Sequence, residues 1–399
     1  MTPPRQASAH RAGGAATEAL AAARQGTRDA YAHGAFDQAI AAQRSILAEA
    51  KAQDAATPDD FLFLGLMLYG AQQLAEGVEI LRDGCGRFPD NAPMHENLGV
   101  FLLQAGDTAG AVAESRRAIA LGSDSPNVHD CLCDAWAQIG RTDEAIAAGC
   151  AALEAKNHKF GAREPLVAIP DGMPPPFNWG HPQENVIAYC LWGSEPRYLV
   201  PLSENVRIAP HLFPGWTVRL YHDATVPQPY LLDLAGRGVE LRTMILPPNV
   251  PVHRKLLWRF EVIADPAVRR FLIRDADSLL SVKERVAVDA WLQSRFWFHS
   301  MRDWYTHTDL LLAGMWGGVG NVLPDTARLM RAYTAWRMEN NHVDQDVLSE
   351  AVWPTIRHHC LIHDSIFTGC LGSVAFPPFG HAAPGMHVGQ NAFLHFKRG

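Results

Sequence analysis

Two aspartates that directly follow a strand-like run are the strongest indication of chemistry in this sequence. Asp275 and Asp277 stand two residues apart, immediately after the apolar segment 270–274. Residues two apart in extended backbone point to the same side, so both carboxylates should converge at a strand's carboxyl end, where open α/β sheets bind ligands. A divalent cation relieves their repulsion and keeps positions open for diphosphate oxygens. Asp-x-Asp also forms Asx turns and helix caps, so its surroundings decide between these functions.

The elements around the two aspartates have the pattern of an α/β domain with a mainly parallel sheet, because strand-like and helical runs alternate. Strands are predicted at 185–191, 217–222, 239–244, 270–274, 296–301 and 358–362, and helices at 196–209, 229–237, 252–264, 283–294, 324–339 and 345–351. The first strand leads into Trp192 and Gly193, where a Rossmann-like sheet would receive a nucleotide. Neither Gly-x-Gly-x-x-Gly nor a P-loop follows, which argues against a dinucleotide cofactor and against a P-loop ATPase.

The segment 18–157 is rich in alanine, has helical periodicity and repeats itself. Leu64, Leu98 and Leu132 lie 34 residues apart. A proline marks the start of three of the repeating units: Pro58, Pro93 and Pro126. A helix–turn–helix period of this length resembles the tetratricopeptide repeat. That resemblance implies a superhelix whose concave face binds a peptide or a protein partner.

A change of composition separates this segment from the rest of the chain. Residues 158–184 are punctuated by prolines and glycines, which is typical of a boundary between domains. We therefore predict repeats over 18–157, a linker over 158–184 and a second domain over 185–399.

The charge and the apolar runs of the chain argue against a nucleic-acid-binding protein and against a membrane-spanning one. A net charge of −7 argues against a surface that binds nucleic acid. The N-terminus has no apolar signal-peptide core, and the longest apolar run, 61–69, is too short to cross a bilayer. Seven cysteines form an odd number that suits free thiols in a reducing compartment. We expect a cytoplasmic protein without a transmembrane segment.

Basic residues precede the aspartate pair. Lys255 and Arg259 lie four apart on the predicted helix 252–264 and would share one helix face, from which both can reach a diphosphate. The alternative is a solvated basic face without a ligand.

The run from Asp344 to Leu348 resembles a motif of glycosyltransferase family eight, which contains retaining enzymes related to glycogenin and lipopolysaccharide galactosyltransferases. The resemblance implies that Asp344 and Gln345 line a sugar pocket, with Gln345 facing the anomeric carbon. The alternative is that Asp344 only caps a helix.

The segment from Gly385 to Gly389 is similar to the family's C-terminal histidine motif. The resemblance implies that His387 completes a metal site with Asp275 and Asp277, and an imidazole beside two carboxylates suits Mn²⁺ better than Mg²⁺. The Lys-Pro-Trp that normally follows in family eight is absent, and Gln390-Asn391-Ala392 stands in its place.

Four further runs are similar to bacterial capsule or polysaccharide-type transferases: 274–278, 291–294, 301–303 and 314–317. They imply that Arg302 and Asp303 lie beside the sugar pocket. Trp316 would offer an aromatic platform to a sugar ring; a tryptophan buried in the core is the alternative. The resemblance covers roughly residues 185–395.

Together these resemblances imply an α plus α/β protein: a tetratricopeptide superhelix followed by a GT-A domain with a mixed, mainly parallel, Rossmann-like sheet. Its expected activity is metal-dependent transfer of a sugar, with retention, from a nucleotide-diphosphate donor to a saccharide or protein acceptor. UDP is the family-level expectation for the nucleotide, and Mn²⁺ or Mg²⁺ for the cofactor. The implied metal ligands are Asp275, Asp277 and His387; the donor-binding residues are Trp192, Gly193, Lys255, Arg259, Arg302 and Trp316; the catalytic residues are Gln345, Asp344 and Asp303.

Two other functions stay open at this point. The protein could be a non-catalytic repeat scaffold whose second domain is a degenerate sugar or nucleotide binder. It could also hydrolyse a nucleotide sugar with a metal, although the sequence identifies no general base for that reaction.

Overall fold

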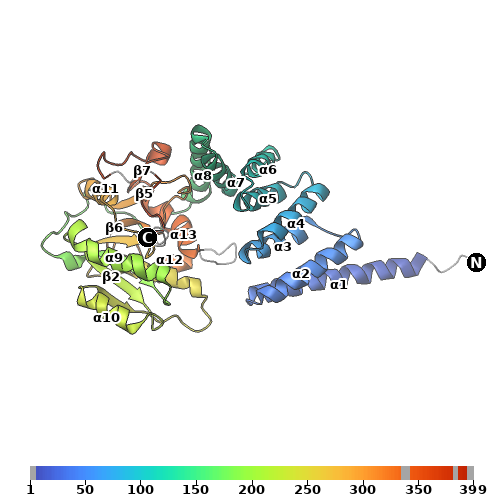
Figure 1. Ribbon diagram of the computed structural model, residues 1–399, viewed down its shortest axis with the longest axis horizontal. Coiled ribbons are helices and arrows are strands. Elements are labelled where there is room, and N and C mark those ends of the chain that lie inside the picture. Colours follow the sequence, from blue (N-terminus) through green and yellow to red (C-terminus); the bar gives the residue numbers. More distant parts are fainter. Residues whose placement is uncertain (1–5, 334–341, 381–384, 393–399) are drawn as a thin grey trace, which may run out of the picture. The chain divides into compact units, whose positions relative to one another are not determined.

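The computed structural model describes residues 6–333, 342–380 and 385–392 (Figure 1). The chain divides into two compact units, Met1–Ala148 and Gly149–Gly399, and each is described by itself. In the described part of the chain, every helix is too short or too polar to cross a membrane.

The first unit consists of helices joined by short turns, as expected for stacked helical hairpins. The helices are α1 (Gln6–Ala32), α2 (Phe36–Ala52), α3 (Pro58–Gly70), α4 (Leu74–Arg87), α5 (Ala92–Gln104), α6 (Thr108–Ala120), α7 (Pro126–Gln138) and the beginning of α8 (Thr142–Gly161). Leu64, Leu98 and Leu132 are buried, as their spacing predicts. The predicted TPR-like helical repeats are therefore confirmed.

Helices α3, α5 and α7 begin at residues that favour the N-terminus of a helix. Prolines occupy the first turn of α3, α5 and α7, where the missing N–H is not needed. The Asn91 side chain caps α5 by accepting from Met94 N, and Thr57 and Asp60 form a capping box at α3. Gly77 has to be small, because a Cβ there would overlap the ring of Phe101.

The second unit is built on a seven-stranded sheet with the order β3-β2-β1-β4-β6-β5-β7. The strands are β1 (Asn185–Leu191), β2 (Thr217–His222), β3 (Glu240–Thr243), β4 (Arg270–Arg274), β5 (Phe298–Arg302), β6 (Met315–Val319) and β7 (Cys360–Asp364). Strand β6 is antiparallel to both β4 and β5, and all other pairings are parallel. The predicted mixed, mainly parallel sheet is confirmed.

Alternation along β1 shows how both faces of the sheet are covered. Ile187, Tyr189 and Leu191 belong to one core with α9 (Pro196–Leu212), α10 (Gln228–Gly236) and α11 (Val282–Leu292). Val186, Ala188 and Cys190 belong to the opposite core. That core contains residues of η2 (Val252–Ala264), α12 (Thr326–Ala332), α13 (Val343–Val347), η3 (Leu348–Val352) and α14 (Trp353–Ile356). Two short turns of helix, η1 (Pro182–Glu184) and η4 (Cys370–Gly372), complete the unit.

The unit begins earlier than the predicted boundary, because α8 continues through it. Lys156 Nζ donates to Thr308 O at 3.0 Å and to Asp309 Oδ1 at 2.8 Å, and Trp353 Nε1 donates to Asn157 Oδ1 at 2.9 Å. The second half of α8 is thus part of the sheet unit, and so is the proline-rich segment, whose Leu166 and Val167 pack on its core.

Several elements differ from the sequence-based expectation. The predicted helix 345–351 is formed by the short helix α13 and the π-helix η3. Strand β6 was not expected, since its Met-Trp-Gly-Gly-Val sequence contains two poor strand formers. Segment η2 is a 3₁₀ helix, not the expected α-helix. Helix α12 ends at Ala332, and the rest of the predicted helix 324–339 lies largely outside the described residues.

Candidate functional site

The order of the strands locates the topological switch point of the sheet unit. From β1 the chain moves to β2 and β3 on one side, and then returns to β4 on the other side of β1. The carboxyl ends of β1 and β4 therefore flank a topological switch point, where open α/β sheets bind their ligands. Trp192 and Gly193 follow β1, and Asp275 and Asp277 follow β4.

Each of the two aspartates is held by an arginine. Asp275, whose side chain is 40% exposed, pairs with Arg259. Asp277 is 15% exposed and accepts from Arg197 Nε at 3.0 Å and Nη2 at 2.7 Å. Burial and the neighbouring Asp275 raise the pKa of Asp277, despite Arg197. Burial is the larger cause, and a cationic ligand would offset the cost of this buried charge.

Gly314 lies directly against the Asp275 carboxylate. It precedes β6, which begins beside the end of β4 because Met315 is paired with Arg274. A Cβ at position 314 would overlap Oδ2 of Asp275. The carboxylate therefore packs on bare main chain, and only glycine leaves it this position.

Arg259 connects the aspartate pair to Asp344. Its guanidinium is buried, contacts Asp275, and donates to Asp344 Oδ2 at 2.7 Å and to Arg274 O at 3.0 Å. Burial acts to lower the pKa of Arg259, but Asp275 and Asp344 raise it overall. Burial and Asp275 raise the pKa of Asp344. The site thus has a buried cation between two carboxylates.

Lys255 lies at a different strand end from Arg259. Its Nζ donates to Asp223 Oδ2 at 2.6 Å and lies 5.9 Å and 5.4 Å from the ring centroids of Trp192 and Trp258. In a 3₁₀ helix, positions four apart point about 120° away from each other. Lys255 and Arg259 therefore do not share one face as predicted: one reaches the end of β2 and the other the end of β4.

Three residues at this edge of the sheet were not predicted: Arg197, Asp223 and Thr225. Thr225 Oγ1 accepts from Gly193 N at 2.7 Å. Burial acts to raise the pKa of Asp223, but hydrogen bonds from Lys255 and Thr225 lower it overall. Asp223 could have been found, because it follows a predicted strand just as Asp275 does.

Asp303 lies in a second group at the carboxyl ends of β5 and β7. Its carboxylate pairs with Lys283 and accepts from Val388 N at 2.8 Å, and Lys283 Nζ also donates to Ser365 Oγ at 2.9 Å. The Asp303 main-chain N–H donates to His307 Nδ1 at 2.9 Å. The C-terminal segment around Val388 is thereby attached to the same edge of the sheet.

His387 is not gathered with the aspartate pair. Its ring stacks on Trp304 at 4.9 Å between centroids, and Nδ1 lies 3.0 Å from the oxygen of Val388. Among the described residues, the ligand atoms of Asp275, Asp277 and His387 do not all lie within 4.8 Å of one another.

Two predicted donor-binding residues are corrected by their burial. Trp316 is fully buried, with Phe260 and Phe271 edge-on to its ring, so it has no face for a sugar. Arg302 is also fully buried and donates from Nε to Asp364 Oδ2 at 2.7 Å. Both residues belong to the interior of the sheet unit.

Gln345 is engaged with the main chain. Its Oε1 accepts from Ala313 N at 3.0 Å, and its Nε2 donates to Leu311 O. The amide that was expected to face a sugar thus holds the loop that ends at Gly314. The Asp344 side chain accepts from Gln345 N at 2.9 Å, and together these bonds link the start of α13 to the aspartate pair.

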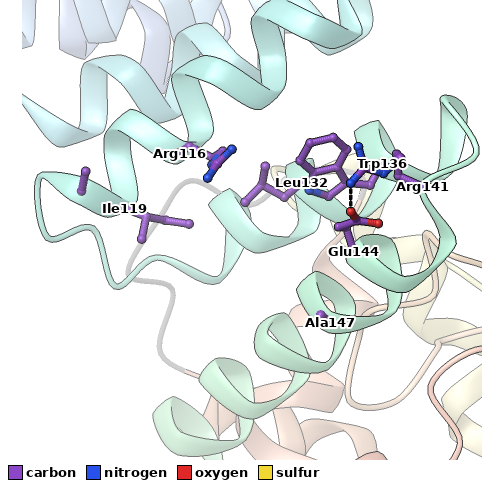
Figure 2. Close-up of a pocket in the computed structure, with 8 residues that line it drawn as sticks. Arg116, Ile119, Leu132, Trp136, Arg141, Glu144 and Ala147 are labelled. Carbon is purple, nitrogen blue, oxygen red and sulfur yellow. Dashed lines mark hydrogen bonds and ion pairs between the residues drawn. The ribbon is translucent and has the colours of Figure 1, made fainter.

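The repeat unit contains a separate hollow of about 640 Å³ between α6, α7 and α8 (Figure 2). The Arg141 guanidinium lies 5.4 Å from the Trp136 ring centroid and pairs with Glu144. Arg116 and Ile119 at its edge are exposed. The surface combines apolar contact with positive charge.

No protein-family model and no curated protein matches the chain. Among solved structures it is similar to the MamA protein, with 21% identity and a TM-score of 0.32 over 35% of this chain and 74% of that chain. A thermophilic TPR protein of Thermus thermophilus has 24% identity and a TM-score of 0.28, over 32% of this chain and 70% of its own. A mutant O-GlcNAc transferase of Thermobaculum terrenum has 17% identity and a TM-score of 0.38, over 61% of this chain and 42% of its own. These scores are low, so function has to be inferred from the geometry of the chain itself.

Proposed function

We propose that the sheet unit is a GT-A glycosyltransferase that takes a sugar from a nucleotide-diphosphate donor. The observation that carries this proposal is the Asp275–Asp277 pair at the switch point between β1 and β4. Three cations, Arg197, Arg259 and Lys255, lie at the same edge of the sheet. Carboxylates and cations side by side suit a metal-bound diphosphate, because the carboxylates bind the metal and the cations bind phosphate oxygens.

The residues at the ends of β1 and β2 suit the nucleoside. Trp192 is half-buried beside Lys255 and offers a ring for stacking. Asp223 can accept from a ribose or base, since carboxylate oxygens are hydrogen-bond acceptors. The diphosphate then extends from β1 toward β4, where Arg197, half exposed at the start of α9, can turn from Asp277 to a phosphate oxygen.

The aspartate pair fits a hard divalent ion, since its donor atoms are carboxylate oxygens and a cation would offset the burial and the neighbouring Asp275 charge that raise the pKa of Asp277. Asp275 and Asp277 would hold Mn²⁺ or Mg²⁺, which would neutralise the leaving diphosphate. Arg259 fixes Asp275 from the buried side. Gly314, which has no Cβ, leaves space for the Asp275 carboxylate. Asp303, beside Lys283, is the proposed carboxylate of the acceptor side.

The experiment that tests this function is a donor screen that measures released nucleoside diphosphate, with Mn²⁺ present or replaced by EDTA. UDP-sugars come first, since they are the donors expected from the resemblance to family eight. Metal-dependent release with transfer to a saccharide or protein supports the proposal. Binding of the nucleotide without turnover across the panel would favour the scaffold alternative, and release of sugar without any transfer would favour hydrolysis.

Gln345 is proposed to act as a positioning residue. Gln345→Ala removes both bonds to the loop that ends at Gly314, so the aspartate pair should lose its alignment. We expect kcat for transfer to fall about 10-fold to 100-fold, with a lower melting temperature and little change in UDP affinity. Gln345→Glu, which keeps one acceptor for Ala313 N, should recover part of kcat. A large loss of kcat at unchanged melting temperature would instead place the amide in the sugar pocket, and support a direct role in retention.

We further propose that the repeat unit binds the acceptor or another protein partner through an acidic segment. The hollow at α6–α8 supports this proposal, because Arg116 is exposed there without an ion pair among the described residues. Arg116→Glu should raise KM for a protein acceptor at least about 10-fold through repulsion of like charges, while donor hydrolysis stays unchanged. Arg82→Glu, an exposed arginine elsewhere in the repeats, serves as the matched control. Equal effects of both variants, or none, would remove the hollow from acceptor binding.

A further inference from the structure

Three side chains with metal-binding atoms meet inside the repeat unit, away from the aspartate pair in the chain. Cys85 lies near the end of α4, His95 in the first half of α5 and Glu114 in the middle of α6. Their ligand atoms all lie within 4.8 Å of one another. One sulfur, one nitrogen and one oxygen thus converge from three successive helices.

The contacts of His95 direct its Nδ1 atom toward Glu114. Its Nε2 is 3.0 Å from Pro89 O, and its Nδ1 is 2.6 Å from Glu114 Oε2. A carbonyl oxygen only accepts, and so does a carboxylate, whereas a neutral imidazole has a single N–H to donate. With that N–H on Pro89 O, the Nδ1 lone pair is on the side of Glu114, where the ligand atoms of Cys85 and Glu114 also lie.

The contact with Pro89 is the kind that metal-binding histidines make. A ligating imidazole almost always donates its other N–H to a carbonyl or carboxylate, which fixes the ring. The His95 side chain is also largely buried, at 10% exposure, while Glu114 is 28% exposed and can rotate. In tetrahedral sites the ligand atoms lie about 3.5 Å apart, so a small rotation of Glu114 would admit an ion.

Two arginines near the cluster, Arg117 and Arg82, bind groups other than the three ligand atoms. Arg117, one turn beyond Glu114 on α6, donates to Pro89 O at 3.3 Å and to Asp90 at 3.1 Å. Its guanidinium is therefore engaged outside the three ligand atoms. Arg82 on α4 is directed to Asp107, at 3.7 Å.

We propose that Cys85, His95 and Glu114 bind a zinc-class divalent metal ion, with one coordination position left open. A mixed sulfur, nitrogen and oxygen set suits Zn²⁺ or Co²⁺, whereas Mg²⁺ and Ca²⁺ prefer oxygen alone. The ion would crosslink α4, α5 and α6, and so stabilise two neighbouring repeats. This inference is independent of the function proposed for the sheet unit.

The test titrates the full-length protein, freed of metal, with Co²⁺. We expect about one equivalent to give the near-ultraviolet charge-transfer band of a thiolate–cobalt bond, and Zn²⁺ to abolish the band by displacement. Oxygen-only coordination at Asp275 and Asp277 cannot produce this band. Cys85→Ser should remove it and weaken binding at the cluster at least about 100-fold. Cys150→Ser, a change at another half-buried cysteine, should leave both unchanged.

A second measurement on the unaltered protein covers the case in which Cys85→Ser does not fold. Burial, with Glu114, raises the pKa of Cys85 to about 12, so the free thiol reacts slowly and alkylation is followed over hours. One equivalent of Zn²⁺ should slow alkylation of the Cys85 peptide further, by at least about 10-fold, without slowing that of Cys150. No charge-transfer band, a band that persists in Cys85→Ser, or equal alkylation with and without Zn²⁺ would overturn the proposal.

Discussion

Asp277→Asn should lower donor turnover at least about 100-fold and leave the melting temperature unchanged or slightly higher. The substitution keeps the size of the side chain but removes the charge proposed to hold the metal. The direction of the stability effect follows from the pKa of Asp277, which burial and Asp275 raise in the folded protein. A carboxyl with a raised folded pKa contributes stability below its unfolded pKa and loses it as pH rises through the folded value. At neutral pH the ionised group is therefore a cost, which asparagine removes.

The measurement pairs steady-state donor turnover with thermal unfolding, at saturating Mn²⁺ and in EDTA. Asp233→Asn, on the exposed surface of α10, is the matched control and should change neither quantity. Near-normal turnover in Asp277→Asn, or in EDTA, would contradict the metal-dependent function.

Arg259→Met should have the largest effect on stability, because it leaves Asp344 buried without its cation. Breaking a buried ion pair by removing one partner costs about 3–5 kcal/mol of unfolding free energy. Donor turnover should also fall, since Asp275 loses the contact that fixes it. Denaturant unfolding measures the first effect and nucleoside diphosphate release the second.

The pH dependence identifies the cause of this loss. The pKa of Asp344 is already raised by burial and Asp275, and removal of Arg259 should raise it further. The stability deficit of Arg259→Met should therefore shrink as pH falls and Asp344 takes up a proton. Arg259→Met combined with Asp344→Asn should regain most of the stability but not the activity. Arg237→Met, which breaks an exposed pair, should change stability by less than about 0.5 kcal/mol. A pH-independent deficit would assign the loss to packing.

Strands and their polar ends were predictable because their signals are local. The apolar runs of β1 and β4 are uninterrupted, that of β2 is broken by Arg219, and the predicted bounds of all three strands are those of the structure. The position of Asp275 and Asp277 at the end of β4, and the 34-residue repeat, were predictable from local sequence in the same way. Strand β6 has no such signal: Gly317 and Gly318 weaken it, and its pairing with β4 and β5 forms it.

Side-chain directions could not be read from residue type. Trp316 and Gln345 occur in runs that resemble a transferase, yet one is core and the other binds main chain. Their surroundings come from segments distant in sequence, such as Phe271 and Ala313. The 3₁₀ geometry of η2 also places Lys255 and Arg259 on different faces. Neither periodicity nor composition distinguishes a 3₁₀ helix from an α-helix over these 13 residues.

The contact between Gly314 and Asp275 gives a criterion for sorting relatives of this chain. A relative could keep both aspartates and still have lost its site, if any larger residue replaced the glycine, since the new Cβ would occupy the place of the carboxylate oxygen. Such a relative would still be retrieved by every search for Asp-x-Asp, although it could no longer form the proposed metal site. The residue after β4 and the residue in the loop before β6 therefore have to be compared together. A relative with aspartate at the first position and glycine at the second can hold the carboxylate in place, whereas one with aspartate and a larger residue cannot.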